Sequence, residues 1–397
     1  MDYSIESRNS ALIITGVIMC FSSFVLLEPS PFDLMVIAFI GYACLSGNLT
    51  FSDELVLPLF FLLLFLLINI LSSFGSEDFS RGLFYGLITV YLAFSWLGLV
   101  GLIGRFGADL YKYVFTGYTI AAVLSAMAGI ASYFGFLPLE DSVLSFGRVK
   151  GFFKDPNVFG PFLIPPILFC LSRLFENKNS YKRTNLITLL ILVGGVFLSF
   201  SRAAWGHMLI SAFIFYLIMP GQSSSKKIKS ILQILLVALP FAIVLFLFTD
   251  ANSMLESRTS LQGYDSDRFE TQNEAFNVGF SKILGIGPGQ SEGYFNYSTH
   301  SLYARIISEN GAIGLLAFLL FYLLSIAAAS IKIKSAGYQS GVYLSIVSAA
   351  LIGLLFNSFF IDTLHWRHLW LLLALSWLPL TNNLKAVHKS ENSPINN

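Results

Sequence analysis

The sequence contains little charge. Only 12% of its 397 residues are Asp, Glu, Lys or Arg, whereas 55% are hydrophobic and the mean hydropathy is +0.71. A water-soluble globule of this length could not cover so much apolar surface. The formal net charge of +1 provides no basic stripe for a phosphate backbone, so nucleic acid is excluded as a partner. The class that remains is an integral membrane protein.

Cysteine is also scarce. Cys20, Cys44 and Cys170 are the three cysteines, and each lies in an apolar stretch, where a free thiol behaves as a small hydrophobic group. We therefore expect no disulfide framework and no zinc site.

Long apolar stretches make up most of the chain. A helix needs roughly 20 mostly apolar residues to cross a bilayer. The pattern predicts an all-α integral membrane protein with about twelve transmembrane helices in a membrane domain at 1–380, followed by a polar cytoplasmic tail at 381–397. We place the helices at 11–27, 31–47, 55–73, 82–103, 110–134, 158–175, 186–201, 203–219, 231–248, 310–330, 341–361 and 367–380.

The distribution of Lys and Arg predicts the orientation. Short basic connections, such as the run of Lys226, Lys227 and Lys229, are typical of the cytoplasmic side. An even number of spans then places both termini inside. The large polar loop at 249–309, between the ninth and tenth helices, consequently faces outward.

The polar loop has the residue types needed for chemistry on a phosphorylated lipid. There is no nucleotide pool outside the membrane, so an activated donor must be attached to a lipid such as a polyprenyl diphosphate. Arg268 can hold a diphosphate with its forked guanidinium, and His300 can act as a general base on an acceptor hydroxyl. We also expect Asp267 to cap a short helix, with Glu270 completing a capping box. The turn from Gly285 to Gly289 allows close approach of the backbone to a ligand.

Two more segments on the same side contain basic residues. The run from Arg148 to Asn157 includes Lys150 and a glycine, and Ser201-Arg202 ends an apolar stretch. The alternative interpretation is that these arginines merely reach the membrane surface, and that the glycine turn is only a turn. His207 is open between packing and a site role, whereas His365 and His368 flank Trp366 in an expected aromatic belt.

Taken together, these motifs resemble the bacterial O-antigen ligase and O-antigen polymerase superfamily. The resemblance rests on Arg148 to Pro161, Ser201 to Ala204, Asp267-Arg268, Gly285 to Gly289, His300 and Glu309-Asn310-Gly311, in that order. It implies a metal-independent glycosyltransferase without cofactors that transfers a glycan from undecaprenyl diphosphate to lipid A-core or to a growing polysaccharide. It further implies catalytic roles for His300, Arg268 and Arg202, and substrate binding by Arg148, Lys150, Asn157, Gly285, Gly287, Gly289 and Glu309.

Several alternatives stay open. Within the superfamily the chain could be a ligase, a polymerase or an enzyme that glycosylates proteins, and we favour the ligase. A flippase or other transporter of lipid-linked oligosaccharides would carry charges along its spans, whereas here they gather at the helix ends. A metal-dependent transferase could use Glu28 and Asp33, although Asp33 is equally explained as a helix N-cap. Asp265 and Asp267 form a second, weaker acidic pair.

Overall fold

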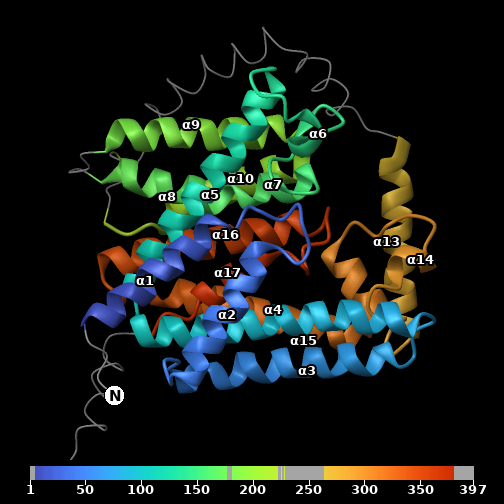
Figure 1. Ribbon diagram of the computed structural model, residues 1–397. Helices are drawn as coiled ribbons and strands as arrows, with labels where there is room; N and C mark the ends of the chain where they lie inside the picture. The colour runs from blue at the N-terminus through green and yellow to red at the C-terminus, as the bar shows by residue number, and fades with distance from the viewer. Residues whose placement is uncertain (1–4, 177–180, 222–224, 226–227, 229–262, 380–397) are drawn as a thin grey trace, which may run out of the picture.

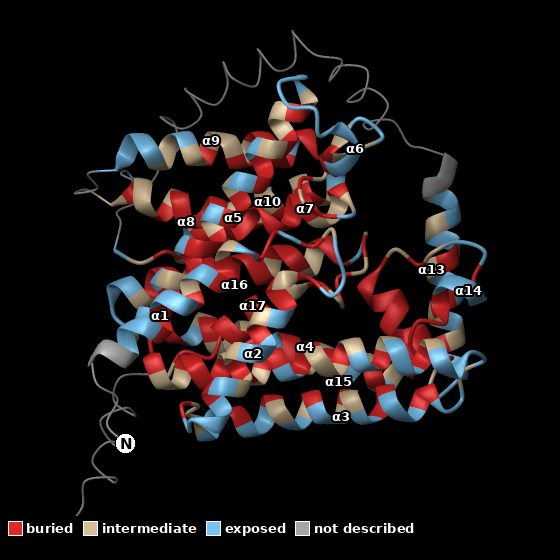
Figure 2. Cartoon of the chain, viewed as in Figure 1, coloured by how far each residue is buried: buried red, intermediate tan, exposed pale blue. Residues whose placement is uncertain are grey.

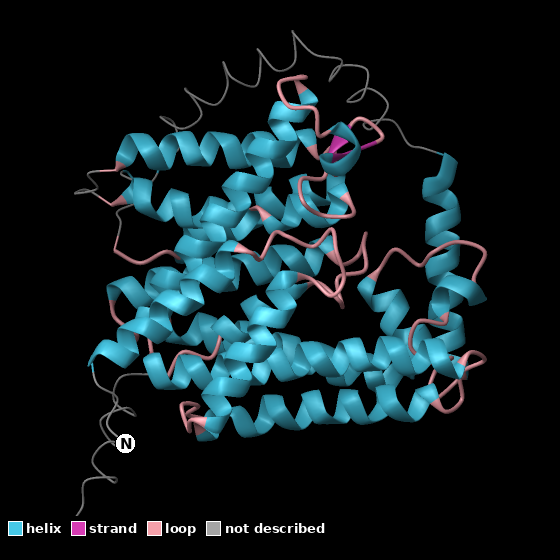
Figure 3. Cartoon of the chain, in the orientation of Figure 1, coloured by secondary structure: helices cyan, strands magenta, loops and turns pink. Residues whose placement is uncertain are grey.

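The computed structural model describes residues 5–176, 181–221, 225, 228 and 263–379. This part of the chain is almost entirely helical, with one short antiparallel hairpin (Figures 1 and 3). The expected helix at 231–248, the loop residues 249–262, the basic residues Lys226, Lys227 and Lys229, and the tail lie outside the described residues.

The elements follow one another along the chain with short connections. The first half contains α1 (Ile5–Cys20), α2 (Pro31–Leu45), η1 (Asp53–Leu55), α3 (Val56–Ser73), α4 (Phe79–Phe106), α5 (Asp109–Tyr133), α6 (Glu140–Val143), β1 (Leu144–Ser145), β2 (Arg148–Val149), α7 (Pro156–Phe162) and α8 (Ile164–Phe175). The second half contains α9 (Lys182–Leu198), α10 (Arg202–Ile218), α13 (Gly263–Ser281), α14 (Ser291–Tyr294), α15 (Leu302–Lys332), α16 (Tyr338–Asn357) and α17 (Arg367–Leu375).

Six helices in the described part are long and apolar enough to cross a membrane. They span Asp53–Ser73, Phe79–Phe106, Asp109–Tyr133, Pro156–Phe175, Leu302–Lys332 and Tyr338–Asn357. Helices α1, α2 and α10 are apolar but shorter. A multi-pass helical membrane protein is therefore supported, whereas the number of twelve spans stays a prediction.

Helix α3 illustrates why these helices suit a bilayer. Leu62 and Phe65 are buried against the bundle, while Phe60, Leu63 and Leu67 on the same helix are exposed. A helix that is apolar both on its buried face and on its exposed face fits an apolar surrounding. The exposed residues follow the outer helices of the bundle in Figure 2.

The helix expected at 158–175 is interrupted in the structure. It consists of α7 and α8, which meet at Leu163. Pro165 and Pro166 have no N–H to donate to the preceding turn, so the helix cannot run through this point unbroken. The break leaves α7 as a short helix next to the hairpin, at the end of the bundle where the polar segments gather.

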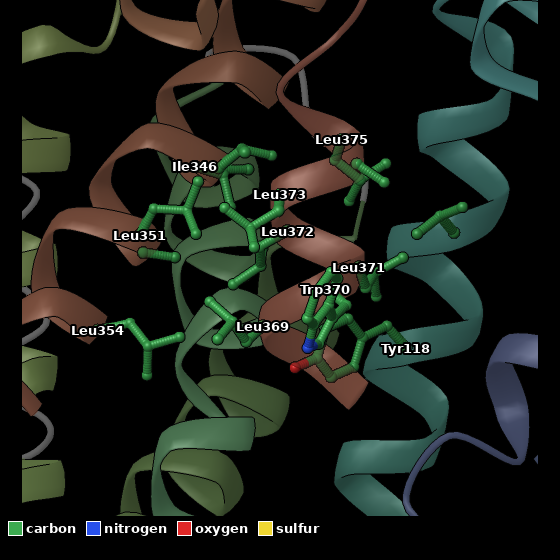
Figure 4. Close-up of a cluster of buried hydrophobic side chains, with 14 of the residues drawn as sticks. Tyr118, Ile346, Leu351, Leu354, Leu369, Trp370, Leu371, Leu372, Leu373 and Leu375 are labelled. Carbon is green, nitrogen blue, oxygen red and sulfur yellow. The ribbon is translucent and has the colours of Figure 1, made fainter. Parts of the chain in front are cut away.

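Helix α17 lies at the centre of the fold. All its residues after Arg367 are buried, and at nine residues it is too short to span a bilayer. Leu369 to Leu375 pack among Tyr118 of α5 and Ile346, Leu351 and Leu354 of α16 (Figure 4). Around this core, α3 packs against α15, α1 against α5, and α10 against α16.

The loops at one end of the bundle converge. Helix α5 ends there, α10 and α15 begin there, and α16 ends there, so the connections at 134–155, 199–201, 282–301 and 358–366 lie at a common end (Figure 3). Side chains from segments far apart in the sequence can therefore meet at that end.

Candidate functional site

A cavity of about 490 Å³, which we call the arginine cavity, opens at the end of the bundle where the loops meet. Five residues that we expect at the site lie on its wall: Arg148, Asn157, Arg202, Arg268 and His300. The rest of the wall is largely aromatic and aliphatic. No Asp or Glu is among the described residues that line it. The cavity therefore gathers cationic groups beside an apolar surface.

Arg148 reaches the arginine cavity from the hairpin. Strands β1 and β2 are joined by Phe146 and Gly147, which have φ angles of 48° and 71°. The guanidinium donates from Nε to the carbonyl oxygen of Ser199 (2.8 Å) and from Nη2 to Oδ1 of Asn157 (2.9 Å). Arg148 consequently links the start of α7 to the turn that precedes α10.

Arg202 and His300 are presented by two similar turns. Arg202 is the first residue of α10, and the side chain of Ser201 caps that helix by accepting from the amide of the third helical residue. His300 precedes Ser301, which caps α15 in the same way. In each turn the residue before the serine has left-handed backbone, with φ of 47° at Phe200 and 41° at His300.

Left-handed backbone at non-glycine residues is uncommon and strained. Such strain persists only where the surrounding structure enforces it, and it concentrates at functional sites. Both turns end at a helix N-terminus, where free N–H groups favour an anion. The two strained turns thus bring an arginine, a histidine and the N-terminus of α10 to the same cavity.

Arg268 comes from α13 and is anchored on the segment after α16. Its Nη2 donates to the carbonyl oxygen of Phe360 (2.6 Å). One turn further along α13, Nε2 of Gln272 lies 3.4 Å from the carbonyl oxygen of Phe359. The position of Arg268 at the cavity therefore depends on the path of residues 359–360.

The expectation that Asp267 caps the helix containing Arg268 is wrong. Helix α13 begins at Gly263, so Asp267 lies inside it, and its carbonyl oxygen accepts from Oγ1 of Thr271 (2.9 Å). An N-cap residue has non-helical backbone, which Asp267 lacks because the helix continues on its N-terminal side.

The environment of His300 favours the neutral imidazole. Burial lowers the pKa of His300 below its ordinary value, and the positive charge of Arg268 lowers it further. The negative charges of Asp155, Asp362 and Glu292 act in the opposite direction without reversing the shift. A neutral imidazole at pH 7 can accept a proton, which is what a general base requires.

The glycine turn lies against α15 and not on the arginine cavity. Gly311 has non-helical angles (φ 68°, ψ 178°) inside α15, which interrupts the helical hydrogen bonding there. The amides of Ile286 and Gly287 donate to the carbonyl oxygens of Ser308 (2.8 Å) and Glu309 (3.0 Å). The turn supplies the donors that the interrupted helix lacks, so its visible role is to dock residues 285–289 onto α15.

Gly285, Gly287 and Gly289 all have positive φ and tight surroundings. A Cβ atom at Gly285 would lie 2.4 Å from the backbone of Glu309, and one at Gly289 would lie 2.2 Å from the ring of Tyr85. Lys150 also does not line the arginine cavity; its backbone amide donates to the carbonyl oxygen of Val143 (2.9 Å). Ligand binding by the glycines and by Lys150 stays a prediction.

Glu309 belongs to a buried ionic cluster that sequence reasoning missed. Arg305 donates from Nε to Glu309 (3.2 Å) and bonds Asp362 through Nη1, while Glu309 accepts from Oγ of Ser291 (2.6 Å). Burial raises the pKa of Asp362, but the charge of Arg305 and the hydrogen bonds that the carboxylate accepts together hold this pKa below its ordinary value.

Through Asp362, this cluster fixes the segment whose Phe360 carbonyl holds Arg268. The spacing of Arg305 and Glu309, four residues apart on a helix, was a visible signal. The partnership with Asp362, 57 residues away, was not.

The acidic residues considered as metal ligands are engaged elsewhere. The carboxylate of Asp33 accepts from Nε and Nη2 of Arg367 (2.6 Å each) and from the hydroxyl of Tyr91 (2.8 Å). The expectation that Asp33 is an N-cap is wrong, because Ser30 caps α2 and Asp33 is the third helical residue of a capping box. Glu28 pairs with Lys154 at 2.8 Å. These contacts do not fit a metal site at Glu28 and Asp33.

Comparison with known proteins connects this geometry to a family. Residues 187–319 match the family model described as O-antigen ligase. The match includes Arg202, Arg268 and His300, whereas Arg148 and Asn157 lie before it. No curated protein matches the chain. The resemblance stated from the motifs is confirmed over residues 187–319, which are similar to the O-antigen ligase family.

Proposed function

We propose that this protein transfers a glycan from undecaprenyl diphosphate to a hydroxyl group of lipid A-core, as an O-antigen ligase. The observation that carries the proposal is the meeting of Arg148, Arg202 and Arg268 with His300 in one cavity. Those three arginines come from the hairpin, α10 and α13, which are far apart in the sequence. If these arginines only reached the water at the membrane surface, they would not need to meet in one cavity.

The arginine cavity suits a diphosphate electrostatically. A guanidinium is always charged and forks onto phosphate oxygens, and three of them line a wall without carboxylates in the described residues. The apolar side of the same wall, with Phe200, Phe356 and Phe360, suits the start of a prenyl chain. One ligand that has both features is a prenyl diphosphate.

The transfer itself needs one base and one stabilised leaving group. The acceptor oxygen forms a bond to the anomeric carbon of the donor sugar while the bond from that carbon to the diphosphate oxygen breaks. His300 takes the proton of the acceptor hydroxyl, and the arginines stabilise the charge that develops on the departing diphosphate. Neither step uses a metal or a nucleotide.

The location follows the same reasoning. We place the protein in the bacterial inner membrane with the arginine cavity on the outer side, where lipid-linked glycans are used. The end of the bundle that contains the arginine cavity is opposite to the end where α4, α8 and α15 finish with basic residues. Basic residues in short connections favour the cytoplasmic side.

Replacing Arg268 by Lys tests the proposal. Arg268→Lys keeps a positive charge but loses the fork and the bond to the Phe360 carbonyl, so we expect transfer to fall roughly 10²-fold. The assay uses purified protein, undecaprenyl-diphosphate glycan and lipid A-core with excess EDTA, alongside binding of undecaprenyl diphosphate. The matched control is Arg81→Lys, since Arg81 pairs with Glu292 at the surface and lies outside the cavity.

The products of this assay separate the related functions. One glycan attached to lipid A-core supports the ligase, and a ladder of lengthening prenyl-linked products identifies a polymerase. Normal transfer by Arg268→Lys would contradict the proposed role of the cavity. Movement of labelled lipid across the bilayer without transfer would identify a transporter instead.

A further inference from the structure

A second cavity, of about 160 Å³, lies beside α7 at the same end of the bundle. Lys154 and Glu28 form its mouth: their Nζ and Oε2 atoms are 2.8 Å apart, and their side chains are 57% and 56% exposed. Phe162, His368 and Leu371, all buried, form its inner wall. The second cavity is therefore a small pocket that opens at the surface and ends inside the bundle.

Two segments separate the second cavity from the arginine cavity. In the segment at the start of α7, Asn157 lines the arginine cavity and Val158 lines the second cavity. In the segment between α16 and α17, Ile361 lines the arginine cavity and His365 lines the second cavity. These segments also contain Asp155 and Asp362, whose charges both act on His300. His300 lines the arginine cavity together with Asn157 and Ile361 of these two segments.

The lining combines apolar rings with polar groups of both signs. Phe32, Phe153 and Trp366 provide apolar surface, and Lys154 and Arg367 provide N–H donors. Each cation already has an acidic partner, because Lys154 pairs with Glu28 and Arg367 holds Asp33. The site thus offers donors and acceptors without a net charge, which suits a neutral molecule with an apolar face and a rim of hydroxyls.

His368 provides an independent indication of a ligand. Its side chain lines the second cavity and the residue is only 5% exposed, yet Nε2 has no hydrogen-bond partner among the described residues. A buried polar atom without a partner is costly and calls for an explanation. A hydroxyl group of a bound molecule can supply the missing bond.

We infer that the second cavity binds a neutral pyranose ring of the acceptor glycan. The ring packs on Trp366 and Phe153, with its hydroxyls toward Glu28, Lys154 and Nε2 of His368. The sugar that follows it in the acceptor then extends across the Asp155 and Asp362 partition and places its hydroxyl at His300. This inference rests on the proposed function for the identity of the acceptor, but the pyranose site itself can be tested without transfer.

Binding of simple glycosides tests the site directly. Saturation-transfer NMR on the full-length protein in detergent uses the methyl glycosides of glucose, galactose, mannose and N-acetylglucosamine as probes. We expect at least one to bind, and Glu28→Gln and Lys154→Met to weaken it roughly tenfold, since each loses a bond from a charged group. Both residues are largely exposed, so the variants keep the fold. The matched control is Glu292→Gln, an acidic residue paired with Arg81 outside both cavities.

The same samples separate this inference from the proposed function. Arg268→Lys should retain glycoside binding and lose undecaprenyl diphosphate, whereas Glu28→Gln should show the reverse. If no glycoside binds, the inference is overturned while the diphosphate site stands. The same holds if Arg268→Lys abolishes glycoside binding and Glu28→Gln does not. If dihexanoyl phosphatidylglycerol binds instead and Lys154→Met abolishes that binding, the cavity is a lipid headgroup site and the inference fails. If the unmodified protein binds a glycoside but not undecaprenyl diphosphate, the proposed function is overturned and the pyranose site stands.

Discussion

The protonation of His300 is set by opposing neighbours. Burial and the charge of Arg268 lower its pKa, while the carboxylates of Asp155, Asp362 and Glu292 raise it. The arginine that is proposed to hold the diphosphate therefore also keeps the proposed base unprotonated. One cation serves both halves of the reaction, which explains why its exact placement by the Phe360 carbonyl matters.

The pH dependence of transfer tests this arrangement. As the pH falls through the pKa of His300, the base becomes protonated and the rate falls, and the lowered pKa places this fall below the range of an ordinary histidine. Asp155→Asn keeps a side chain that can cap α7 but removes a charge that raises the pKa. We expect the acid limb of the pH–rate profile to move to lower pH in Asp155→Asn.

Asp141→Asn is the control for this measurement. Asp141 is an exposed residue of α6 and is not among the charges that act on His300. A limb that stays in place or moves to higher pH in Asp155→Asn would show that His300 is not the base.

The residues that meet in the arginine cavity were predictable where a chemical type stood out against apolar sequence. Arg202, Arg268 and His300 are conspicuous for that reason, and the structure brings them together. Asp362 was not predictable, because a carboxylate near an expected helix end looks like any surface residue until its partner is known. Its partner Arg305 is 57 residues away, and only the packing of α15 against the end of α16 reveals the pair.

Among the elements, α15 shows how a local rule and a tertiary contact combine. Its sequence predicted a helix, but the helix begins at Leu302 and not at residue 310, since Ser301 caps it and the polar residues Arg305 and Glu309 satisfy one another inside. Hydropathy alone assigns Arg305 and Glu309 to the loop that precedes the helix, because both residues are charged. The interruption at Gly311 is likewise invisible without the glycine turn that docks on it.

Substitution of Gly285 tests the docking of the glycine turn. Gly285 has φ of 73°, and a Cβ there would lie 2.4 Å from the backbone of Glu309, so Gly285→Ala adds a clash to an unfavourable backbone. Gly47 has φ of 67° with nothing within 4 Å, so Gly47→Ala reports the backbone effect alone. We expect Gly285→Ala to lower the free energy of unfolding by a further ~1–3 kcal/mol.

Thermal unfolding in detergent compares the two variants. Equal midpoints for Gly285→Ala and Gly47→Ala would mean that residues 285–289 do not press against α15 in solution. A variant of Gly285 that loses undecaprenyl diphosphate binding at an unchanged midpoint would favour the ligand-binding role predicted from the sequence.

At the scale of the whole molecule, hydropathy predicted the class of the protein but not the interior arrangement. The positions of the six long apolar helices followed from composition, because a bilayer-crossing helix must be apolar whatever its neighbours are. The central position of α17 did not, since an apolar stretch that is buried from His368 to Leu375 looks like one more span in the sequence. Its burial arises from contacts with α4, α15 and α16, which periodicity cannot identify.

The distribution of charge over the bundle predicts its orientation in the membrane. Basic residues lie at the end opposite to the arginine cavity, at the helix ends that contain Arg105, Arg173 and Lys332. Positive residues in short connections favour the cytoplasmic side. The cavity end, to which α6 belongs, should therefore face outward (Figure 1).

Single cysteines at the two ends of the bundle test this orientation. Glu140 on α6 and Ser335 after α15 are both exposed, and they lie at opposite ends of the fold. In a background in which the three native cysteines are replaced by Ala, Glu140→Cys should react with an impermeant thiol reagent in intact spheroplasts. Ser335→Cys should react only after lysis. The reverse labelling would place the arginine cavity in the cytoplasm, where nucleotide-linked donors are present, and would remove the reason for a lipid-linked substrate.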